Sequence, residues 1–314
     1  MDLVTDIVRV YWARRDRCSI VESLDKEWYR MKTLAQALKE GSLFLSERNV
    51  ADASIDSWLL LSFCCKIDRA TYFMNKENIM PQEEYDHYMQ LILLRSEHIP
   101  LQHLTGEQEF MGLTFYVNED VLIPRQDTEI LVEEILKVSK GKRILDVCTG
   151  SGCILISLDK LSDIESGLGV DLSKRALLVA QKNGKTLDSK VTFMESDMYS
   201  RITGTYDIIV SNPPYIPSSD VSSLMEEVRV HEPMMALDGK EDGLYFYKVL
   251  CNRLKEFLVP GGFVFFEIGY NQGKDVTDLL KEAGMSEIKI TKDLAGLDRV
   301  VSAQYKKECE EPFT

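Results

Sequence analysis

The sequence predicts an α/β protein in which a helical domain and a β-hairpin precede a mainly parallel β-sheet. The first hundred residues have helical periodicity without strand signals, residues 106–117 alternate between apolar and polar side chains, and seven strand-like runs follow Pro124. At 314 residues the chain is long enough for two domains. We predict a helical domain at 1–105, which includes an extension at 1–27 without an assigned role, a hairpin linker at 106–123 and a sheet domain at 124–314.

Three segments of the first domain have apolar side chains at helical spacing. Gly41 follows the first segment in the position of a helix C-cap. The second segment begins near Asp52 or Ser54, and the third runs from Pro81 towards Arg95. The residues predicted to share the apolar faces are Met31, Leu34, Ala35 and Leu38, then Ile55, Leu59 and Phe63, then Tyr85, Met89 and Ile92.

The sheet domain is predicted from strand-like runs that alternate with helical patterns such as 174–183 and 273–283. This alternation gives a mainly parallel sheet with helices on both faces. In such a sheet, ligands bind at the carboxyl ends of the strands. The predicted strands are 144–147, 167–171, 190–195, 206–211, 262–267, 286–291 and 299–304.

The composition is that of a globular protein with a strongly acidic balance. A formal charge of −14 and a pI near 4.9 disfavour direct binding of nucleic acid through its phosphates and favour a basic protein partner. Seven cysteines without paired C-x-x-C spacing indicate core thiols in a reducing compartment and no metal site. The N-terminus has no signal-peptide pattern and no apolar run is long enough for a bilayer, so we expect a cytoplasmic protein that does not bind membranes.

The segment "ILDVCTGSGCI" at 144–154 combines a short apolar strand, a turn of small residues and a helix start. Gly150 and Gly152 allow positive φ and a close approach of a ligand to the backbone, and amides at a helix N-terminus bind carboxylate or phosphate. The alternative is a glycine turn that serves only tight packing. The pattern is not the dinucleotide fingerprint G-x-G-x-x-G, because a third glycine is missing.

The next two strands also end in candidate ligand-binding residues. Asp171 in "GLGVDLS" is suited to accept both hydroxyls of a ribose, although it or Ser173 is also a candidate helix N-cap. Asp197, Met198 and Tyr199 in "ESDMY" offer an acceptor for an adenine amino group beside an apolar wall, or serve only as packing at the strand end. Together, the three strand ends predict a pocket for an adenosyl group with an amino-acid tail.

The motif "SNPPYIP" follows a buried strand at 206–210, which the two prolines must end. If the cofactor is S-adenosylmethionine, the enzyme must supply a nitrogen with an available lone pair. The side-chain oxygen of Asn212 and the carbonyl of Pro213 are predicted to accept hydrogen bonds from that nitrogen, and the pyrrolidine rings hold both acceptors still. Tyr215 is predicted to stack on the planar substrate group. The alternative is a rigid loop in which the ring of Tyr215 fills a gap.

These motifs resemble those of the release-factor N5-glutamine methyltransferases, which methylate the glutamine of a Gly-Gly-Gln tripeptide in class I peptide chain release factors. The resemblance covers roughly 93–303. Besides "NPPYI" it includes "PLQHLTGEQEF" at 100–110, "VLIPRQDTEILVEE" at 121–134, "HEPMMALDGKEDGL" at 231–244, "FEIGYNQG" at 266–273 and "DLAGLDRVV" at 293–301. It implies a helical domain, a hairpin and a seven-stranded, Rossmann-like class I methyltransferase domain with an antiparallel last strand.

The resemblance also assigns residues and ligands. It implies S-adenosyl-L-methionine as cofactor, S-adenosyl-L-homocysteine as product, no metal, and a class I release factor as protein substrate. Phe110 is similar to an aromatic residue that lines the cofactor pocket. The implied cofactor-binding residues are Cys148, Thr149, Gly150, Ser151, Gly152, Asp171, Met198 and Asn212, and the implied substrate-binding residues are Asn212, Pro213, Pro214 and Tyr215, of which Asn212, Pro213 and Tyr215 are the catalytic candidates.

The sequence departs from the family pattern at two positions, so alternative substrates remain to be considered. Cys148 stands where glycine is usual, and "CTGSGC" resembles the enzymes that methylate a glutamine of a large-subunit ribosomal protein. Met198 replaces what is often a larger aromatic residue. "IPRQDTE" and "DLAGLDRVV" nevertheless follow the release-factor branch. A second alternative is N6-adenine methylation of nucleic acid, which requires a basic groove and which the acidic balance disfavours. A third is an assembly factor that binds the cofactor without catalysis; its signature would be a broken NPPY motif, and this motif is intact.

Overall fold

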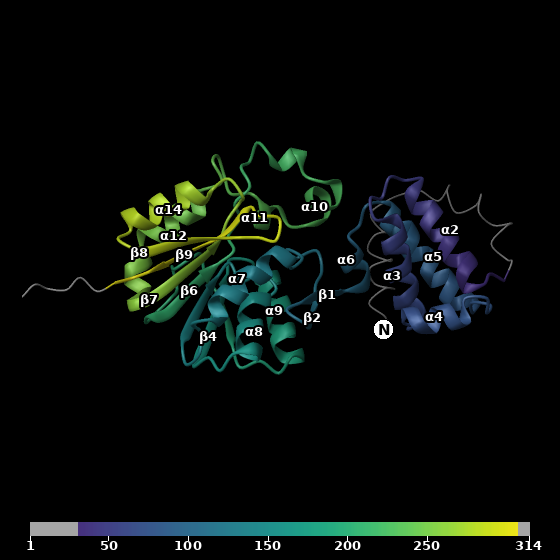
Figure 1. Cartoon of the computed structure of the whole chain (residues 1–314), viewed down its shortest axis with the longest axis horizontal. Helices are drawn as coiled ribbons and strands as arrows, with labels where there is room; N and C mark the ends of the chain where they lie inside the picture. The colour runs from purple at the N-terminus through teal and green to yellow at the C-terminus, as the bar shows by residue number, and fades with distance from the viewer. Residues whose placement is uncertain (1–30, 307–314) are drawn as a thin grey trace, which may run out of the picture. The chain divides into compact units, whose positions relative to one another are not determined.

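The protein divides into two compact units, with the boundary between Thr105 and Gly106 (Figure 1). The structure, a computed structural model, describes residues 31–306. The extension predicted at 1–27 lies outside the described residues. The hairpin that follows Gly106 belongs to the second unit, together with the sheet.

The first unit is helical, as predicted. Tyr85, Met89 and Ile92 are buried in its core, which confirms the predicted face of the third segment. The capping box of α2, in which Thr33 and Gln36 bond each other's backbone amides, fixes the start of that helix. The helices are α2 (Leu34–Ser46), α3 (Ala53–Cys65), α4 (Arg69–Asn75), α5 (Gln82–Ser96) and α6 (Leu101–Thr105). Of these, α4 and α6 were not predicted.

Gly41 is not a helix C-cap, since α2 continues through it to Ser46. The reason for a glycine is the close approach of Tyr88. A Cβ atom at position 41 would lie 2.0 Å from the Tyr88 hydroxyl oxygen. That hydroxyl shares a hydrogen bond of 2.7 Å with Ser57 on α3, so Gly41 lets α5 approach α2 while the bond is kept.

Gly41→Ala should destabilise the first unit by roughly 1–3 kcal/mol because the added methyl displaces Tyr88. Helix propensity alone predicts the opposite sign, a gain of about 1 kcal/mol. Urea unfolding of the full chain measures the difference, with the exposed Lys39→Ala on the same helix as the control. A variant as stable as the parent would show that α2 and α5 can move apart without a loss of stability.

The predicted buried face of α3 is wrong for two of its three residues, and only Phe63 packs against the core. Ile55 and Leu59 are 55% and 40% exposed, and α3 buries Asp56, Ser57 and Trp58 instead. Asp56 forms an ion pair of 2.7 Å with Arg95 on α5, which offsets the cost of burying both charges. Hydrophobic periodicity missed this face because two of its buried side chains are polar. Met31, also predicted for the core, is exposed and precedes α2.

The predicted hairpin is present and packs within the second unit. Strands β1 (Glu107–Phe110) and β2 (Leu113–Tyr116) are joined by Met111 and Gly112, which both have positive φ as tight hairpin turns require. Asn183 accepts from the backbone amide of Tyr116 and donates to its carbonyl oxygen and to that of Ser151. One side chain therefore joins the hairpin to the turn that follows the first strand of the large sheet.

The second unit contains the predicted seven-stranded sheet, in the order β5-β4-β3-β6-β7-β9-β8. Strands β3 to β7 are parallel, and β9 is antiparallel to both of its neighbours. Its strands are β3 (Arg143–Val147), β4 (Ser166–Asp171), β5 (Thr192–Glu195), β6 (Tyr206–Ser211), β7 (Leu258–Glu267), β8 (Ser286–Lys292) and β9 (Asp298–Gln304).

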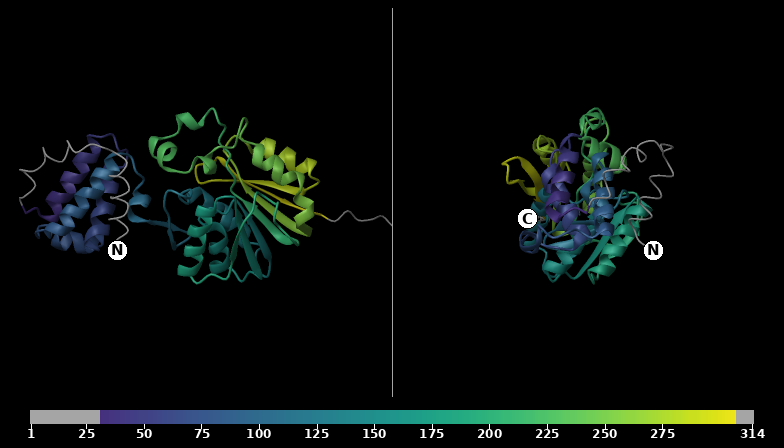
Figure 2. Two further views of the ribbon diagram at one scale, coloured as in Figure 1. Left: turned by 180° about the vertical axis from the view of Figure 1, so that it is seen from behind. Right: turned by 90° about the vertical axis from the view of Figure 1, so that its right-hand side faces the viewer.

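Helices cover both faces of this sheet (Figure 2). Side chains that alternate along each strand enter two different cores, so Ile144 packs on one face and Leu145 on the other. Helices α7 (Gln126–Leu136), α8 (Cys153–Leu161) and α9 (Lys174–Thr186) lie on the first face, and α12 (Tyr245–Asn252), α13 (Leu254–Phe257) and α14 (Gly273–Glu282) on the second. The segment between β6 and α12 contains a short 3₁₀ helix, η2 (Val221–Ser223), and two short helices, α10 (Glu226–His231) and α11 (Met234–Leu237).

The five cysteines between residues 31 and 306 are free thiols that are buried or half-buried, as predicted. Cys18 and Cys309 lie outside that range. Within the same range, no group of three or more His, Cys, Asp or Glu side chains is arranged to hold a metal ion. None of the described helices combines the length and the apolar character that crossing a membrane requires.

Candidate active site

A pocket lies where the carboxyl ends of β4, β3 and β6 meet. The parallel register places Val147 beside Val170 and Ser211, so the loops that follow these strands are neighbours. The pocket brings together most of the predicted site residues, namely Cys148, Thr149, Gly150, Ser151, Asp171, Met198, Asn212 and Pro214. Gly152, Pro213 and Tyr215 do not line it.

The turn after β3 has the left-handed geometry that its glycines suggested. Cys148, Gly150 and Gly152 have φ values of 63°, 55° and 78°. A Cβ at Gly150 would meet no atom within 4 Å, so its Cα faces open space in the pocket. A Cβ at Gly152 would lie 3.0 to 3.2 Å from side chains of β5, α8 and α9, so this glycine serves close packing and its predicted cofactor contact stays a prediction. Cys148 adopts a backbone conformation that glycine accommodates more easily.

Asp171 is hydrogen-bonded to this turn. Its two carboxylate oxygens accept from the backbone amides of Gly150 at 3.0 Å and Ser173 at 2.8 Å. Burial raises the pKa of Asp171, and these amide bonds oppose the shift. Ser173, not Asp171, is the N-cap of α9, since its hydroxyl accepts from the amide of Ala176. Asp171 is therefore held in place with lone pairs still available on both oxygens.

Asp146 is a buried carboxyl below the turn that the sequence analysis did not single out. Its Oδ2 accepts from the Thr149 hydroxyl at 2.6 Å, and its Oδ1 has no hydrogen-bond partner among the described residues. Burial raises the pKa of Asp146 to about 7, against the hydrogen bond from Thr149. A buried acceptor without a partner, next to a pocket, is suited to a cationic or hydrogen-bonding ligand.

Asp146→Asn should make the ligand-free protein more stable at pH 8. The native carboxyl keeps its proton up to about pH 7, whereas the unfolded chain releases it near pH 4, so stability falls as pH rises through this window. The variant should narrow the Tm difference between about pH 5 and pH 8 and raise Tm at pH 8 by roughly 2–8 °C. Thermal unfolding measures this, with exposed Asp163→Asn as the control. If the Tm of the variant depends on pH as that of the parent does, the raised pKa of Asp146 would be contradicted.

The third strand end contributes part of what was predicted. Asp197 and Met198 line the pocket. Tyr199 does not form the predicted apolar wall, because its ring stacks on Phe257 in the core with centroids 4.6 Å apart. Phe110 does not line the pocket either, since it is buried against Phe115 in the core beneath α7 and α8.

Asn212 enters the pocket from the end of β6, and its amide nitrogen is already engaged. Its Nδ2 donates to the hydroxyl oxygen of Thr128 on α7 at 3.4 Å. Thr128 is buried and also lines the pocket. Because the nitrogen is held by Thr128, the side-chain oxygen of Asn212 remains as the acceptor for a ligand.

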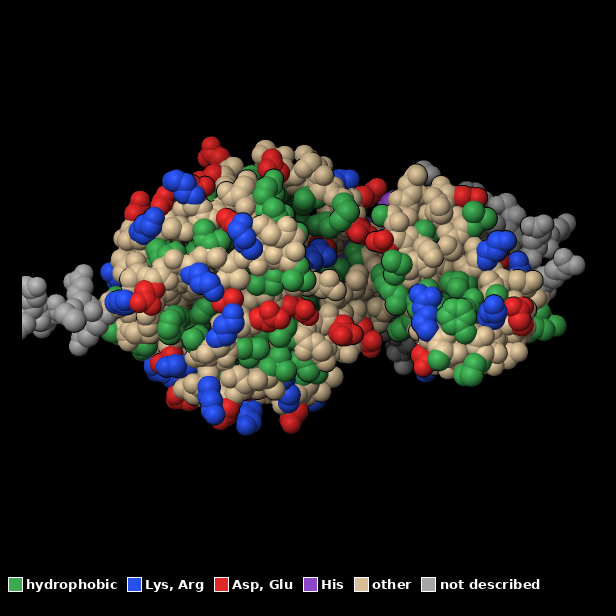
Figure 3. Space-filling view, viewed as in Figure 1, with side chains coloured by type: hydrophobic (Ala, Val, Ile, Leu, Met, Phe, Trp, Pro, Cys, Tyr) green, Lys and Arg blue, Asp and Glu red, His purple; other side chains and the backbone are tan. Residues whose placement is uncertain are grey.

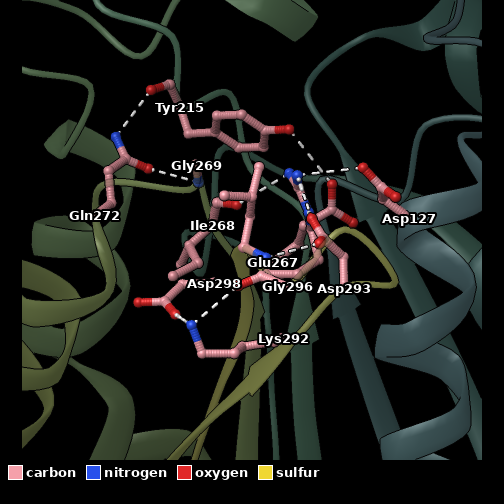
Figure 4. A network of polar contacts seen from close by, with 12 residues as sticks. Asp127, Tyr215, Glu267, Ile268, Gly269, Gln272, Lys292, Asp293, Gly296 and Asp298 are labelled. Carbon is pink, nitrogen blue, oxygen red and sulfur yellow. Dashed lines mark hydrogen bonds and ion pairs between the residues drawn. The ribbon is translucent and has the colours of Figure 1, made fainter.

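Tyr215 is fixed at both ends (Figure 4). Its backbone oxygen accepts from Gln272 at 2.9 Å, and its hydroxyl donates to Glu267 at 3.4 Å. Gly243 makes the fit possible, because a Cβ there would lie 2.4 Å from the Tyr215 backbone oxygen. The segments "LDGKEDG" and "GYNQG" therefore enclose the turn at 212–215 and limit its movement.

The segment between β6 and α12 borders the same pocket through Pro233, Met235 and Ala236. It is joined to the irregular segment that leads into α7 by Glu232, which pairs with Arg125 and accepts from the backbone amide of Ile123 at 3.2 Å. Burial raises the pKa of Glu232, and the charge of Arg125 opposes the shift. This pair has no local sequence signal, because its two residues are 107 positions apart.

The comparisons with known proteins agree with this architecture. Residues 36–106 match the family described as PrmC N-terminal domain, and residues 125–238 match the methyltransferase small domain. Among solved structures, the catalytic domain of hMettl16 in complex with MAT2A 3′UTR hairpin 6 has a TM-score of 0.51 and is 16% identical, with 72% of this chain and 82% of that chain covered. At that identity, the likeness supports the fold alone.

Sequence relatives are closer and cover nearly the whole chain. The release factor glutamine methyltransferase of Geobacter sulfurreducens is 37% identical over 83% of this chain and 93% of its own length. That of Clostridium botulinum is 38% identical over 86% and 99%, and that of Bacillus subtilis 35% identical over 88% and 99%. With this identity, this coverage and a methyltransferase fold, the chain belongs to the release factor glutamine methyltransferase family.

Proposed function

We propose that the protein transfers a methyl group from S-adenosyl-L-methionine to N5 of the glutamine in the Gly-Gly-Gln motif of class I peptide chain release factors. The names of its relatives support the substrate and the reaction class. The observation that carries the proposal is that Asn212 lines the pocket while its amide nitrogen donates to Thr128, which leaves the side-chain oxygen as an acceptor. Because release factors act on ribosomes, the proposal implies action in the cytoplasm.

The residues around the pocket fit this cofactor. Asp171 would accept the ribose hydroxyls, the turn at 148–152 would hold the amino-acid tail, and Met198 would contact the base. The unpartnered oxygen of Asp146 offers a further acceptor beneath the turn. When bound, the cofactor supplies an electrophilic methyl group on its sulfonium, and S-adenosyl-L-homocysteine is the product.

Asn212 and Pro213 would prepare the substrate nitrogen. An amide nitrogen is a poor nucleophile because its lone pair is delocalised into the carbonyl group. Two acceptors, Oδ1 of Asn212 and the carbonyl oxygen of Pro213, would bind its two hydrogens and favour pyramidal geometry as the nitrogen–carbon bond forms. The nitrogen, now positively charged, then loses one proton to water, which restores a neutral amide. Tyr215 would orient the planar amide, and Pro214 would hold the turn rigid.

Mass spectrometry of a release factor produced without its methyltransferase tests the proposal. The release factor is incubated with this protein and S-adenosyl-L-methionine. A gain of one methyl group, about 14 Da, on the Gly-Gly-Gln glutamine is expected, with none for Asn212→Ala. Methylation elsewhere, or none with cofactor binding intact, would contradict the proposal and direct the assay to ribosomal protein and then to nucleic acid.

The charge distribution favours a protein substrate over nucleic acid. On the face drawn in Figure 3, Lys and Arg side chains are interspersed with Asp and Glu. Nucleic acid binding relies on clustered positive charge that displaces counterions, whereas the formal charge here is −14. An electrophoretic mobility shift with RNA or DNA at physiological salt should therefore be negative.

A further inference from the structure

Glu267, the last residue of β7, is a buried carboxyl that the proposed reaction does not use. Its residue is 2% exposed. Oε1 accepts from the Tyr215 hydroxyl at 3.4 Å, and its backbone oxygen accepts from the Tyr247 hydroxyl at 2.7 Å. Oε2 has no hydrogen-bond partner among residues 31–306. Complete burial of a carboxyl group lowers the stability of the fold. An apolar side chain at this position would avoid that cost, so the carboxyl is expected to have a function.

The charges around Glu267 do not neutralise it. Arg299 on β9 is near enough to influence its ionisation, but its guanidinium forms ion pairs with Asp293 at 3.0 Å and Asp127 at 3.2 Å. Burial raises the pKa of Glu267 to about 7, against a hydrogen bond with Thr128 and the charge of Arg299. Asp127 adds to the rise. Glu267 is therefore not explained as one half of a structural ion pair.

The same carboxyl is linked directly to one end of the substrate-binding turn. It holds the Tyr215 hydroxyl at 3.4 Å. Thr128, which accepts from Asn212 at the other end, is near enough to influence the ionisation of Glu267. Asn212 and Tyr215 begin and end the four-residue motif, and their separation decides where a substrate amide sits between acceptor and ring. A misplacement of about 1 Å at such a site costs about 10²-fold in rate.

We propose that Glu267 is a positioning residue for methyl transfer, which fixes Tyr215 relative to Asn212 from the core of the protein. The proposal rests on the proposed function, since it assigns Glu267 to the same substrate site. It requires an acceptor at position 267 and does not require a negative charge.

The test compares Glu267→Leu with Glu267→Gln. Leucine removes the acceptor at similar volume, so kcat for release-factor methylation should fall about 10²-fold while the cofactor Kd, from calorimetry, changes less than about threefold. Glutamine keeps one acceptor oxygen and should retain kcat within about tenfold of the parent. Exposed Glu282→Leu is the control for the substitution itself.

A double-mutant cycle with Tyr215→Phe separates positioning from general damage. If Glu267 acts through Tyr215, the double variant should lose less kcat than the product of the two single losses, by at least about fivefold. Additive losses, or a Glu267→Leu enzyme with normal kcat, would overturn the proposal. If the leucine variant does not fold, the cycle is run with Glu267→Met, which also lacks the acceptor, and the same outcomes decide. No methylation by the parent enzyme would contradict the proposed function instead.

Discussion

Asn212→Ala should lower kcat for release-factor methylation by at least about 10³-fold, because one of the two acceptors that prepare the nitrogen is lost in the transition state. The cofactor Kd should rise by no more than about tenfold, since Asn212 is one of many residues around the pocket. Steady-state kinetics with a radiolabelled methyl donor and calorimetry of cofactor binding provide the two numbers.

The control is Asn252→Ala, the same substitution at an exposed position on α12. It should leave both kcat and Kd at the parental values. An Asn212→Ala enzyme that retains a tenth or more of the parental rate would exclude the proposed role of the amide oxygen. Equal losses in rate and cofactor affinity would instead assign Asn212 to cofactor binding alone.

Asp171→Ala should weaken cofactor binding by about 10²-fold. The variant loses the acceptor for the ribose hydroxyls, and it also leaves the amides of Gly150 and Ser173 without their partner, so the turn after β3 loses its support. At a saturating concentration of cofactor, kcat should recover to within about fivefold, because the groups that contact the substrate are unchanged.

Calorimetry with S-adenosyl-L-homocysteine measures this loss without turnover, and Asp163→Ala, an exposed residue, is the control. Unchanged affinity would remove the ribose assignment of Asp171. A fall in kcat that saturating cofactor does not restore would show that the turn also positions the reacting atoms.

The strand ends were predictable because their signals are local. Each parallel strand is marked by an apolar run, and the residues that follow Val147, Val170 and Ser211 must meet at one edge of the sheet once the strands are parallel. Gly150, Asp171 and Asn212 were therefore brought together from the sequence alone, and the structure places all three around one pocket.

The residues that support the site were not predictable in this way. Thr128 reaches Asn212 across 84 positions, and Glu267 reaches Tyr215 across 52. These contacts depend on how α7 docks on the sheet and on the register of β7, neither of which leaves a local pattern. The buried face of α3 was predicted wrongly for a related reason, because the burial of Asp56 depends on its ion pair with Arg95. Polar residues whose partners are distant in sequence appear as surface residues until the tertiary structure is known.

The place of β9 in the sheet has a consequence for biosynthesis. Among residues 31–306 it is the last strand in sequence, yet it lies between β7 and β8, and β8 pairs with no other strand there. During translation, β7 and β8 leave the ribosome before the strand that joins them, so each presents an unpaired edge that is prone to aggregation. A nascent chain that stops before Asp298 would lack β9, and β7 and β8 would then have no strand between them. The sheet can therefore be completed only after residues 298–304 have been synthesised.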